Sequence, residues 1–328
     1  MSQRIAQGDR DTALKLAEKA FALKPKHAET QDILLKLQAE QQDWTGARST
    51  LEAKRRSGDL SKDVFRRRDA VLALQEARVV MEAGSSIEAR EAAIAANKLS
   101  PDLVPAAAMA GRSLALSGDA KGATRVLKKA WEAQPHPDLA AAFAEIAPEE
   151  TPLQRLKRFK LLIDARPDHV ESRLLQTELL IAAEDFPGAR RALGDLPETG
   201  PTGRVMALRA AIARGEGADE AEVRGWMARA LTAPRGPQWC CDKCQAIHAQ
   251  WGPICDNCGG FDTLSWREPP QSETMTPTGA EMLPLLVNPP KPAPAAPTSA
   301  SPSAPPPPEA EVIEAEAIDL AEIARRGS

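Results

Sequence analysis

Tyrosine is absent from this chain of 328 residues, and aromatic residues make up only 4 % of it. Alanine and leucine carry its apolar share instead, which is typical of soluble proteins whose helices pack on small residues. An excess of positive charge is also missing, because 42 Lys and Arg stand against 46 Asp and Glu. The net charge of -4 argues against nucleic acid as the main partner.

Long apolar runs are missing as well. No stretch approaches the roughly 18 apolar residues of a membrane span, and Arg4 and Asp9 stand where a signal peptide would be apolar. Cysteines are not scattered along the chain, because all five lie between Cys240 and Cys258. This clustering favours a metal site in a reducing compartment. We therefore expect the chain, as given, to be cytoplasmic.

A period of 34 residues organises the middle of the chain. Four residues recur at this displacement: Gly84, Ala89, Ala96 and Pro101 return as Gly118, Ala123, Ala130 and Pro135. Glycine permits a tight turn, alanine lets a helix approach its neighbour closely, and proline ends the helix that it follows. Small residues and a closing proline at this spacing resemble the second helix of the tetratricopeptide repeat. The resemblance predicts an all-α superhelical solenoid over residues 1–234.

The predicted helices follow one another in pairs. Apolar periodicity and turn residues place them near residues 27–41 and 44–57, 61–83 and 86–98, 103–117 and 120–133, 169–183 and 186–196, and 201–214 and 219–232. One pair is irregular, because Pro148 and Pro152 separate a short helix after Pro137 from a longer one near 152–165. In such a solenoid the first helices line an inner groove, which is the usual binding surface for partner proteins.

The start of the chain matches a second helix without its first. Gly8, Ala13, Ala20 and Pro25 have the spacing of the repeat, yet only seven residues precede Gly8. We therefore expect the chain to begin in mid-repeat, as a fragment or as a subunit whose missing half lies upstream. The alternative is that residues 1–7 form a frayed cap.

Basic residues gather in two places. Lys54–Arg56 lies close in sequence to Arg66–Arg68, and a second run spans Arg155–Lys160. These runs indicate either an anionic partner, such as an acidic peptide, a phospholipid head group or nucleic acid, or ordinary solvated helix faces.

A cysteine module follows over residues 238–268. Cys241, Cys244, Cys255 and Cys258 form two C-x2-C knuckles separated by ten residues, a spacing at which four thiolates close a tetrahedron around Zn2+. Iron in a rubredoxin-like site and a pair of disulfides are the alternatives. Four protein thiolates leave no open coordination position, so the predicted zinc ribbon is structural and not catalytic.

Two neighbours of these cysteines leave further options open. Cys240 is a surplus thiol that either occupies a small apolar position or shifts the first knuckle to C-x3-C, and His248 is an alternative ligand. Trp239, Trp251, Phe261 and Trp266 are dense for a chain so poor in aromatics. We expect these four aromatic residues to form the minimal core of a module that requires metal to fold.

Beyond the module the composition changes. Half of the 28 prolines lie in residues 267–328, which predicts a disordered, proline-rich linker over residues 269–308. A short amphipathic helix is expected over residues 309–326, with Ile313, Leu320 and Ile323 on one face. It would serve either as a partner-binding motif or as a tail that improves solubility.

Several phrases resemble the C-terminal region of the bacterial HemY family, tetratricopeptide-repeat membrane proteins associated with haem biosynthesis. They are Trp131 with Pro135–Leu139, Leu153–Arg158, Pro167–His169, Glu171–Leu174 and Phe261–Trp266. The resemblance covers about residues 1–268, and the order of repeats and four-cysteine ribbon is also similar to that of LapB, an inner-membrane tetratricopeptide adaptor. Members of the HemY family carry N-terminal membrane helices that this sequence does not show. Their presence would anchor a cytoplasmic repeat domain at the inner membrane.

The resemblance implies a non-enzymatic interaction scaffold whose groove holds proteins, among them enzymes of haem biosynthesis. One alternative is a carrier or enzyme that binds a tetrapyrrole, with His136 or His169 as the axial ligand of the iron. Another is nucleic-acid binding through the ribbon, which the charge balance disfavours.

Overall fold

The computed structural model describes residues 10–82 and 86–270 of the chain. Outside these lie the residues before Arg10, on which the predicted mid-repeat start depends, and Gly84 of the repeat motif. The predicted helix 309–326 and all but the first two residues of the predicted linker 269–308 also lie outside.

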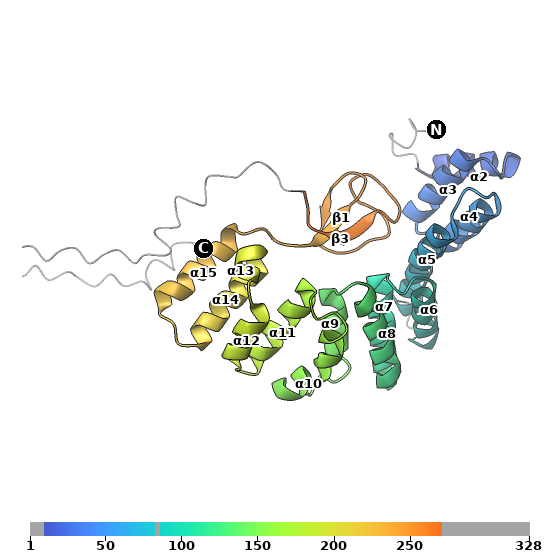
Figure 1. Ribbon diagram of the computed structural model, residues 1–328. Helices are drawn as coiled ribbons and strands as arrows, with labels where there is room; N and C mark the ends of the chain where they lie inside the picture. The colour runs from blue at the N-terminus through green and yellow to red at the C-terminus, as the bar shows by residue number, and fades with distance from the viewer. Residues whose placement is uncertain (1–9, 83–85, 271–328) are drawn as a thin grey trace, which may run out of the picture. The chain divides into compact units, whose positions relative to one another are not determined.

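The described chain is an all-α tetratricopeptide-type array of helix pairs followed by a small β-ribbon (Figure 1). The helices are α2 (Arg10–Leu23), α3 (Ala28–Glu40), α4 (Trp44–Arg56), α5 (Lys62–Glu82), α6 (Ser86–Leu99), α7 (Val104–Leu116), α8 (Ala120–Ala133), α9 (Pro137–Ala144), α10 (Pro152–Ile163), α11 (Val170–Ala182), α12 (Phe186–Leu193), α13 (Leu196–Thr199), α14 (Gly203–Gly215) and α15 (Glu220–Thr232). The predicted helices begin and end within three residues of these bounds. None of the helices in the described ranges is both long and apolar enough to cross a membrane.

The second helices of three pairs begin with the same kind of N-cap. Asp43, Asp119 and Asp185 are the N-caps of α4, α8 and α12, and each carboxylate accepts a hydrogen bond from the backbone N–H of a glycine three residues later. A Cβ atom on any of these glycines would lie 2.0–2.2 Å from the capping carboxylate oxygen. Glycine therefore leaves room for the capping carboxylate in these three caps, whereas Asp219, which has a different backbone conformation, caps α15 through the backbone N–H of Glu222.

Small residues let paired helices approach each other closely. Ala123 and Ala130 of α8 are buried, and Gly111 of α7 faces the side chain of Leu127 across the same pair. Burial of these positions explains why small residues recur with the 34-residue period, since a larger side chain would push the two helices apart.

The helix predicted over residues 186–196 is interrupted. The last turn of α12 ends at Leu193 because Gly194 adopts φ 55 and ψ -128, a conformation that side chains disfavour. The short helix α13 follows, with Pro197 in its first turn.

The ribbon is a three-stranded antiparallel sheet of order β2-β1-β3. The strands are β1 (Gln238–Cys241), β2 (Ile247–His248) and β3 (Leu264–Arg267). In the register of β1 and β3, Trp239 lies opposite Trp266 and Cys241 opposite Leu264. The two cysteine knuckles extend from this sheet as loops.

The ribbon and the helices share one hydrophobic core. Trp239, Trp251 and Leu264 of the ribbon belong to the same buried cluster as Trp131, Phe143 and Phe159 of the helices. The partly buried Ile254 and Phe261 join a second cluster with Leu35 and Leu72. The ribbon thus packs on helices and is not a separate appendage at the end of the repeats.

Candidate metal centre

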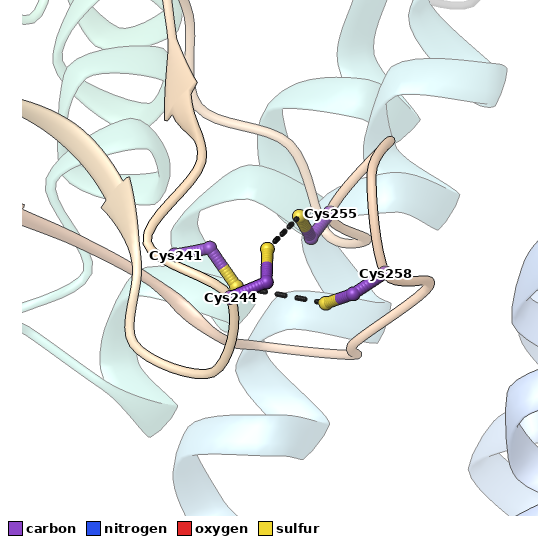
Figure 2. Close-up of side chains that lie close together, drawn as sticks. All are labelled: Cys241, Cys244, Cys255 and Cys258. Atoms are coloured by element: carbon purple, nitrogen blue, oxygen red, sulfur yellow. Dashed lines mark hydrogen bonds between the residues drawn. The ribbon is translucent and has the colours of Figure 1, made fainter.

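Four sulfur atoms converge between the two knuckles (Figure 2). The Sγ atoms of Cys241, Cys244, Cys255 and Cys258 all lie within 4.8 Å of one another. Cys241 Sγ is 3.7 Å from Cys258 Sγ, and Cys244 Sγ is 3.6 Å from Cys255 Sγ. A tetrahedron of thiolates about 2.3 Å from a zinc ion has edges of about 3.8 Å. The four predicted ligands are therefore brought together at distances that fit a metal ion.

Both knuckles close in the same way. The backbone N–H of Gln245 donates to the carbonyl oxygen of Cys241 at 2.9 Å, and that of Gly259 donates to the carbonyl oxygen of Cys255 at 2.8 Å. Gln245 has φ 63 and Gly259 has φ 64. The first knuckle therefore adopts the left-handed turn even though its residue is not glycine, at the cost of some backbone strain.

Among the described residues no disulfide is formed, and neither Cys240 nor His248 belongs to the group of four converging ligand atoms. All five cysteines are free thiols. Cys240 is fully buried on β1, and its Sγ lies 3.7 Å from the carbonyl oxygen of Arg267, away from the other sulfurs. His248 lies beside the site and not in it, with Nε2 3.3 Å from Cys255 Sγ and Nδ1 3.6 Å from Asp256.

Burial and hydrogen bonds act on the thiols in opposite directions. Burial opposes the thiolate of Cys241, yet its hydrogen bond with Thr263 and those from the backbone N–H groups of Cys244 and Lys243 outweigh this effect and lower its pKa to about 6. Burial dominates at Cys255 and raises its pKa to about 12. A cation among the sulfurs would favour all four thiolates. Thr263, which sequence reasoning missed, is a neighbour that supports Cys241.

His136 connects the ribbon to the helices. It is the N-cap of α9, and its Nδ1 accepts a hydrogen bond from the backbone N–H of Asp138 at 3.0 Å. The imidazole ring is only 1 % exposed, with its centroid 5.1 Å from that of Trp239 and 4.2 Å from that of Trp266. Burial lowers the pKa of His136 to about 4, although the nearby Asp138 raises it. The residue is therefore a neutral packing group at neutral pH.

His169, the other predicted axial ligand, has a similar local role without the ribbon contact. It is the N-cap of α11, and its Nδ1 accepts a hydrogen bond from the backbone N–H of Glu171 at 3.1 Å. Burial and the charge of Arg166 lower its pKa. Each of the two histidines thus caps a helix with one ring nitrogen.

Arg67 forms the polar link between ribbon and helices. Its Nε lies 3.3 Å from Asp262 of the ribbon, and its Nη1 lies 3.4 Å from Asp102 in the loop before α7. Burial raises the pKa of Asp262, whose side chain is only 10 % exposed, while Arg67 lowers it. A second cationic contact places the guanidinium of Arg78 5.6 Å from the ring centroid of Trp251.

These contacts place the ribbon on first helices of the pairs. Leu35 belongs to α3, Arg67 and Arg78 to α5, Val104 to α7 and His136 to the start of α9. The sequence predicted that this face is open to partners, but part of it is covered by the ribbon. The ribbon thus leaves only part of the face formed by the first helices exposed.

Each of the two basic runs contains cations that are paired with carboxylates and cations that are not. Lys54 pairs with Asp32, and Arg55 and Arg56 pair with Glu52. In the run Arg155–Lys160, Arg158 pairs with Glu150 and Lys160 with Asp164. Arg66 has neither an ion pair nor a hydrogen bond to another described residue.

Comparisons with known proteins give structural likenesses only. No protein-family model and no curated protein matches this chain. A tetratricopeptide repeat protein from Parabacteroides merdae matches 70 % of this chain and 95 % of its own, with 14 % identity and a TM-score of 0.33. YrrB, a TPR protein with an unusual peptide-binding site, matches 52 % of this chain and 85 % of its own at 20 % identity and a TM-score of 0.32. A thermophilic TPR protein from Thermus thermophilus matches 55 % of this chain and 95 % of its own, at 20 % identity and a TM-score of 0.27. These TM-scores are too low to support a fold assignment, which therefore rests on the helix pairs of this chain.

Proposed function

We propose that this chain is a non-enzymatic scaffold that binds partner proteins on its helix pairs. The supporting observation is the hydrophobic cluster shared by the helices and the ribbon, beside which Trp239 and Trp266 of the ribbon pack on His136. This packing holds several helix pairs in a fixed relation, which is what a surface that recognises another protein requires. Residues 1–234 would supply the binding surface, and residues 238–268 would hold the helix pairs in place.

Within this proposal the four cysteines bind a structural Zn2+ ion. The donor set is four thiolates, which soft or borderline metals prefer and which leaves zinc no open position for a substrate. The ion would close the two knuckles and thereby hold β1 and β3 against the helices. Iron is the alternative metal for the same four sulfurs.

A more specific form of the proposal, called the finer form below, names the partner proteins and their cellular location. The HemY resemblance, carried by the sequence phrases alone, makes haem-biosynthesis enzymes at the cytoplasmic face of the inner membrane the partners to test first. Cross-linking in cells that express the tagged chain, followed by identification of the captured proteins, tests the general proposal. Reproducible capture of a defined partner would support a scaffold, and recovery of haem-pathway enzymes would support the finer form.

The control for this experiment should keep the fold. Deleting residues 235–268 would expose His136, which is only 1 % exposed and packs on Trp239 and Trp266 of the ribbon, so loss of capture by that variant would not identify a binding site. Point substitutions on exposed helix positions avoid this problem. Failure of the wild-type chain to capture any protein reproducibly would contradict the scaffold.

The competing function is a tetrapyrrole carrier. Its predicted axial ligands are poorly placed, because His136 is enclosed by Trp239 and Trp266 and uses Nδ1 as a helix cap, and His169 caps α11. Haem titration of the full chain tests this function. A Soret band that disappears in His136→Ala or His169→Ala would favour the carrier over the scaffold.

A further inference from the structure

A cleft of about 740 Å³ lies where the ribbon meets the first turns of α5. Five cationic side chains line it, namely Arg66, Arg67, Arg68, Lys98 and Lys129. Three carboxylates line it as well, from Asp63, Asp102 and Asp262. We name this site the basic cleft. It brings together parts of α5, α6, α8 and the ribbon that are far apart in the sequence.

The carboxylates of the basic cleft neutralise only part of its positive charge. Arg67 is held by Asp102 and Asp262, and the hydroxyl of Ser100 donates to Asp102 at 2.5 Å. Within residues 10–82 and 86–270, Arg66, Lys98 and Lys129 have no ion pair or hydrogen bond through their side chains. All three are exposed at the cleft. The half-buried Arg68 likewise has no ion pair or hydrogen bond in these residues, although its charge acts on Asp262. The paired Arg67 thus lies beside three exposed cations whose charge remains available.

Most side chains of the other basic stretches have carboxylate partners, although the exposed Lys157 has no ion pair or hydrogen bond to another described residue. Lys54, Arg55 and Arg56 are each paired with a carboxylate of α3 or α4, as described above. Arg158 is paired with Glu150 and lies over the rings of Phe143 and Phe159. Those side chains stabilise helices, whereas the free cations of the basic cleft surround an open space.

We propose that the basic cleft binds an acidic peptide segment of a partner protein. This inference rests on the proposed scaffold function and specifies one of its sites. Carboxylates of the partner would pair with Arg66, Lys98 and Lys129, which gives charge complementarity and speeds association. Val64, Leu99 and Pro101 also line the cleft and provide apolar contacts for a side chain between two acidic residues.

The lining favours a peptide over a nucleic acid. Proteins that bind single strands stack bases on aromatic side chains, and the residues that line the basic cleft include no aromatic ring. Asp63, Asp102 and Asp262 would also repel a continuous chain of phosphates, whereas a peptide can place its separate carboxylates between them.

The test uses the full chain and a labelled peptide rich in glutamate and aspartate with interspersed leucines. Fluorescence anisotropy should show binding that weakens as salt increases. The triple variant Arg66→Gln/Lys98→Gln/Lys129→Gln should lose about tenfold in affinity, because each exposed charge pair contributes modestly. The peptide in which Gln and Asn replace the acidic residues should bind to neither protein.

A matched control removes the same charge elsewhere. Lys15, Lys19 and Lys157 are exposed and have no ion pair or hydrogen bond through their side chains to other described residues. The variant Lys15→Gln/Lys19→Gln/Lys157→Gln should bind the acidic peptide like the wild type. Equal losses in the two variants would show a general charge effect and overturn the basic cleft. Circular dichroism of both variants, which should match the wild type, checks that the helices are intact.

Other outcomes separate this inference from the scaffold itself. Absence of peptide binding by the wild-type chain at low salt would overturn the basic cleft, as would a single-stranded oligonucleotide that binds more tightly than the peptide. If the cleft variant captures the same cross-linked partners as the wild type in equal amount, the scaffold stands and this inference fails. If the wild-type chain captures no partner but binds the acidic peptide only through these three cations, the cleft stands and the cellular scaffold fails.

Discussion

Trp266 of the ribbon lies edge-on to His136 at the start of α9, with the ring centroids 4.2 Å apart and the planes inclined by 61°. Helices α9 to α15 lie between the two residues in the sequence. Both residues nevertheless belong to the contact that joins the ribbon to the helices. His136 therefore has two roles, because it also caps α9 through Nδ1.

Replacing His136 should destabilise the chain more than replacing His169. His136→Ala loses a helix cap worth about 1 kcal/mol and two aromatic contacts worth about 0.5–1.5 kcal/mol each. His169→Ala loses mainly the cap of α11, so its cost should be about 1 kcal/mol. Urea unfolding followed by circular dichroism measures both. Equal destabilisation by the two substitutions would mean that the contact of His136 with the ribbon contributes little.

The buried imidazole should also make stability depend on pH. Burial lowers the pKa of His136 to about 4 in the folded chain, whereas an unfolded histidine titrates near about 6.5. Between these values the unfolded chain binds a proton that the folded chain does not, so the free energy of unfolding decreases as the pH falls. From pH 7 to pH 5 the decrease should be about 2 kcal/mol larger in the wild type than in His136→Gln. Parallel pH profiles of the two proteins would contradict this assignment.

The metal content should depend on four cysteines and not on the fifth. Cys258→Ser removes a proposed ligand and should abolish stoichiometric zinc in the purified chain. Cys240→Ser is the matched control, because Cys240 is buried beside the site but its Sγ faces the carbonyl oxygen of Arg267. Elemental analysis with an absorption spectrum measures the result, since ferric four-thiolate sites are coloured. Retention of full metal by Cys258→Ser would contradict the proposed ligand set.

Removing Arg67 should loosen the ribbon. Arg67→Ala leaves the nearly buried carboxylate of Asp262 without its cation, at an expected cost of about 2 kcal/mol. Arg66→Ala is the matched control, because the neighbouring Arg66 is exposed and unpaired among the described residues, and it should change stability by less than about 0.5 kcal/mol. Hydrogen exchange of β1 and β3 should accelerate in the first variant alone. Unchanged exchange in Arg67→Ala would show that apolar packing suffices to hold the ribbon.

Two glycine substitutions should have opposite signs. A Cβ atom at Gly111 would lie 2.7 Å from Cγ and Cδ2 of the buried Leu127, so Gly111→Ala should cost about 1–3 kcal/mol by overpacking α7 against α8. A Cβ atom at Gly225 in α15 would meet no other atom within 4 Å, and Gly225→Ala should stabilise the helix by up to about 1 kcal/mol. Thermal unfolding tests both. A neutral Gly111→Ala variant would contradict the close approach of this helix pair.

The helix pairs and the grouping of the four sulfurs could be predicted from local patterns of residues. Asp119 with Gly122 specifies a helix start within three residues, and the small residues Ala123 and Ala130 specify the face that packs. The same holds for the knuckles, where Cys241 and Cys244 are separated by two residues. These features depend on interactions between near neighbours in the chain, so spacing alone was enough to predict them.

The position of the ribbon and the pairing of individual cations depend on contacts between segments that are distant in the sequence. Arg67 pairs with Asp262 across 195 residues, and nothing in the local pattern of Arg66, Arg67 and Arg68 distinguishes the paired side chain from its neighbours. The position of His136 at a helix start favoured a capping or surface role over axial ligation, but its contact with Trp266 became visible only in the folded chain. The physical reason is that packing between distant segments depends on how whole elements meet in space, which neither periodicity nor spacing encodes.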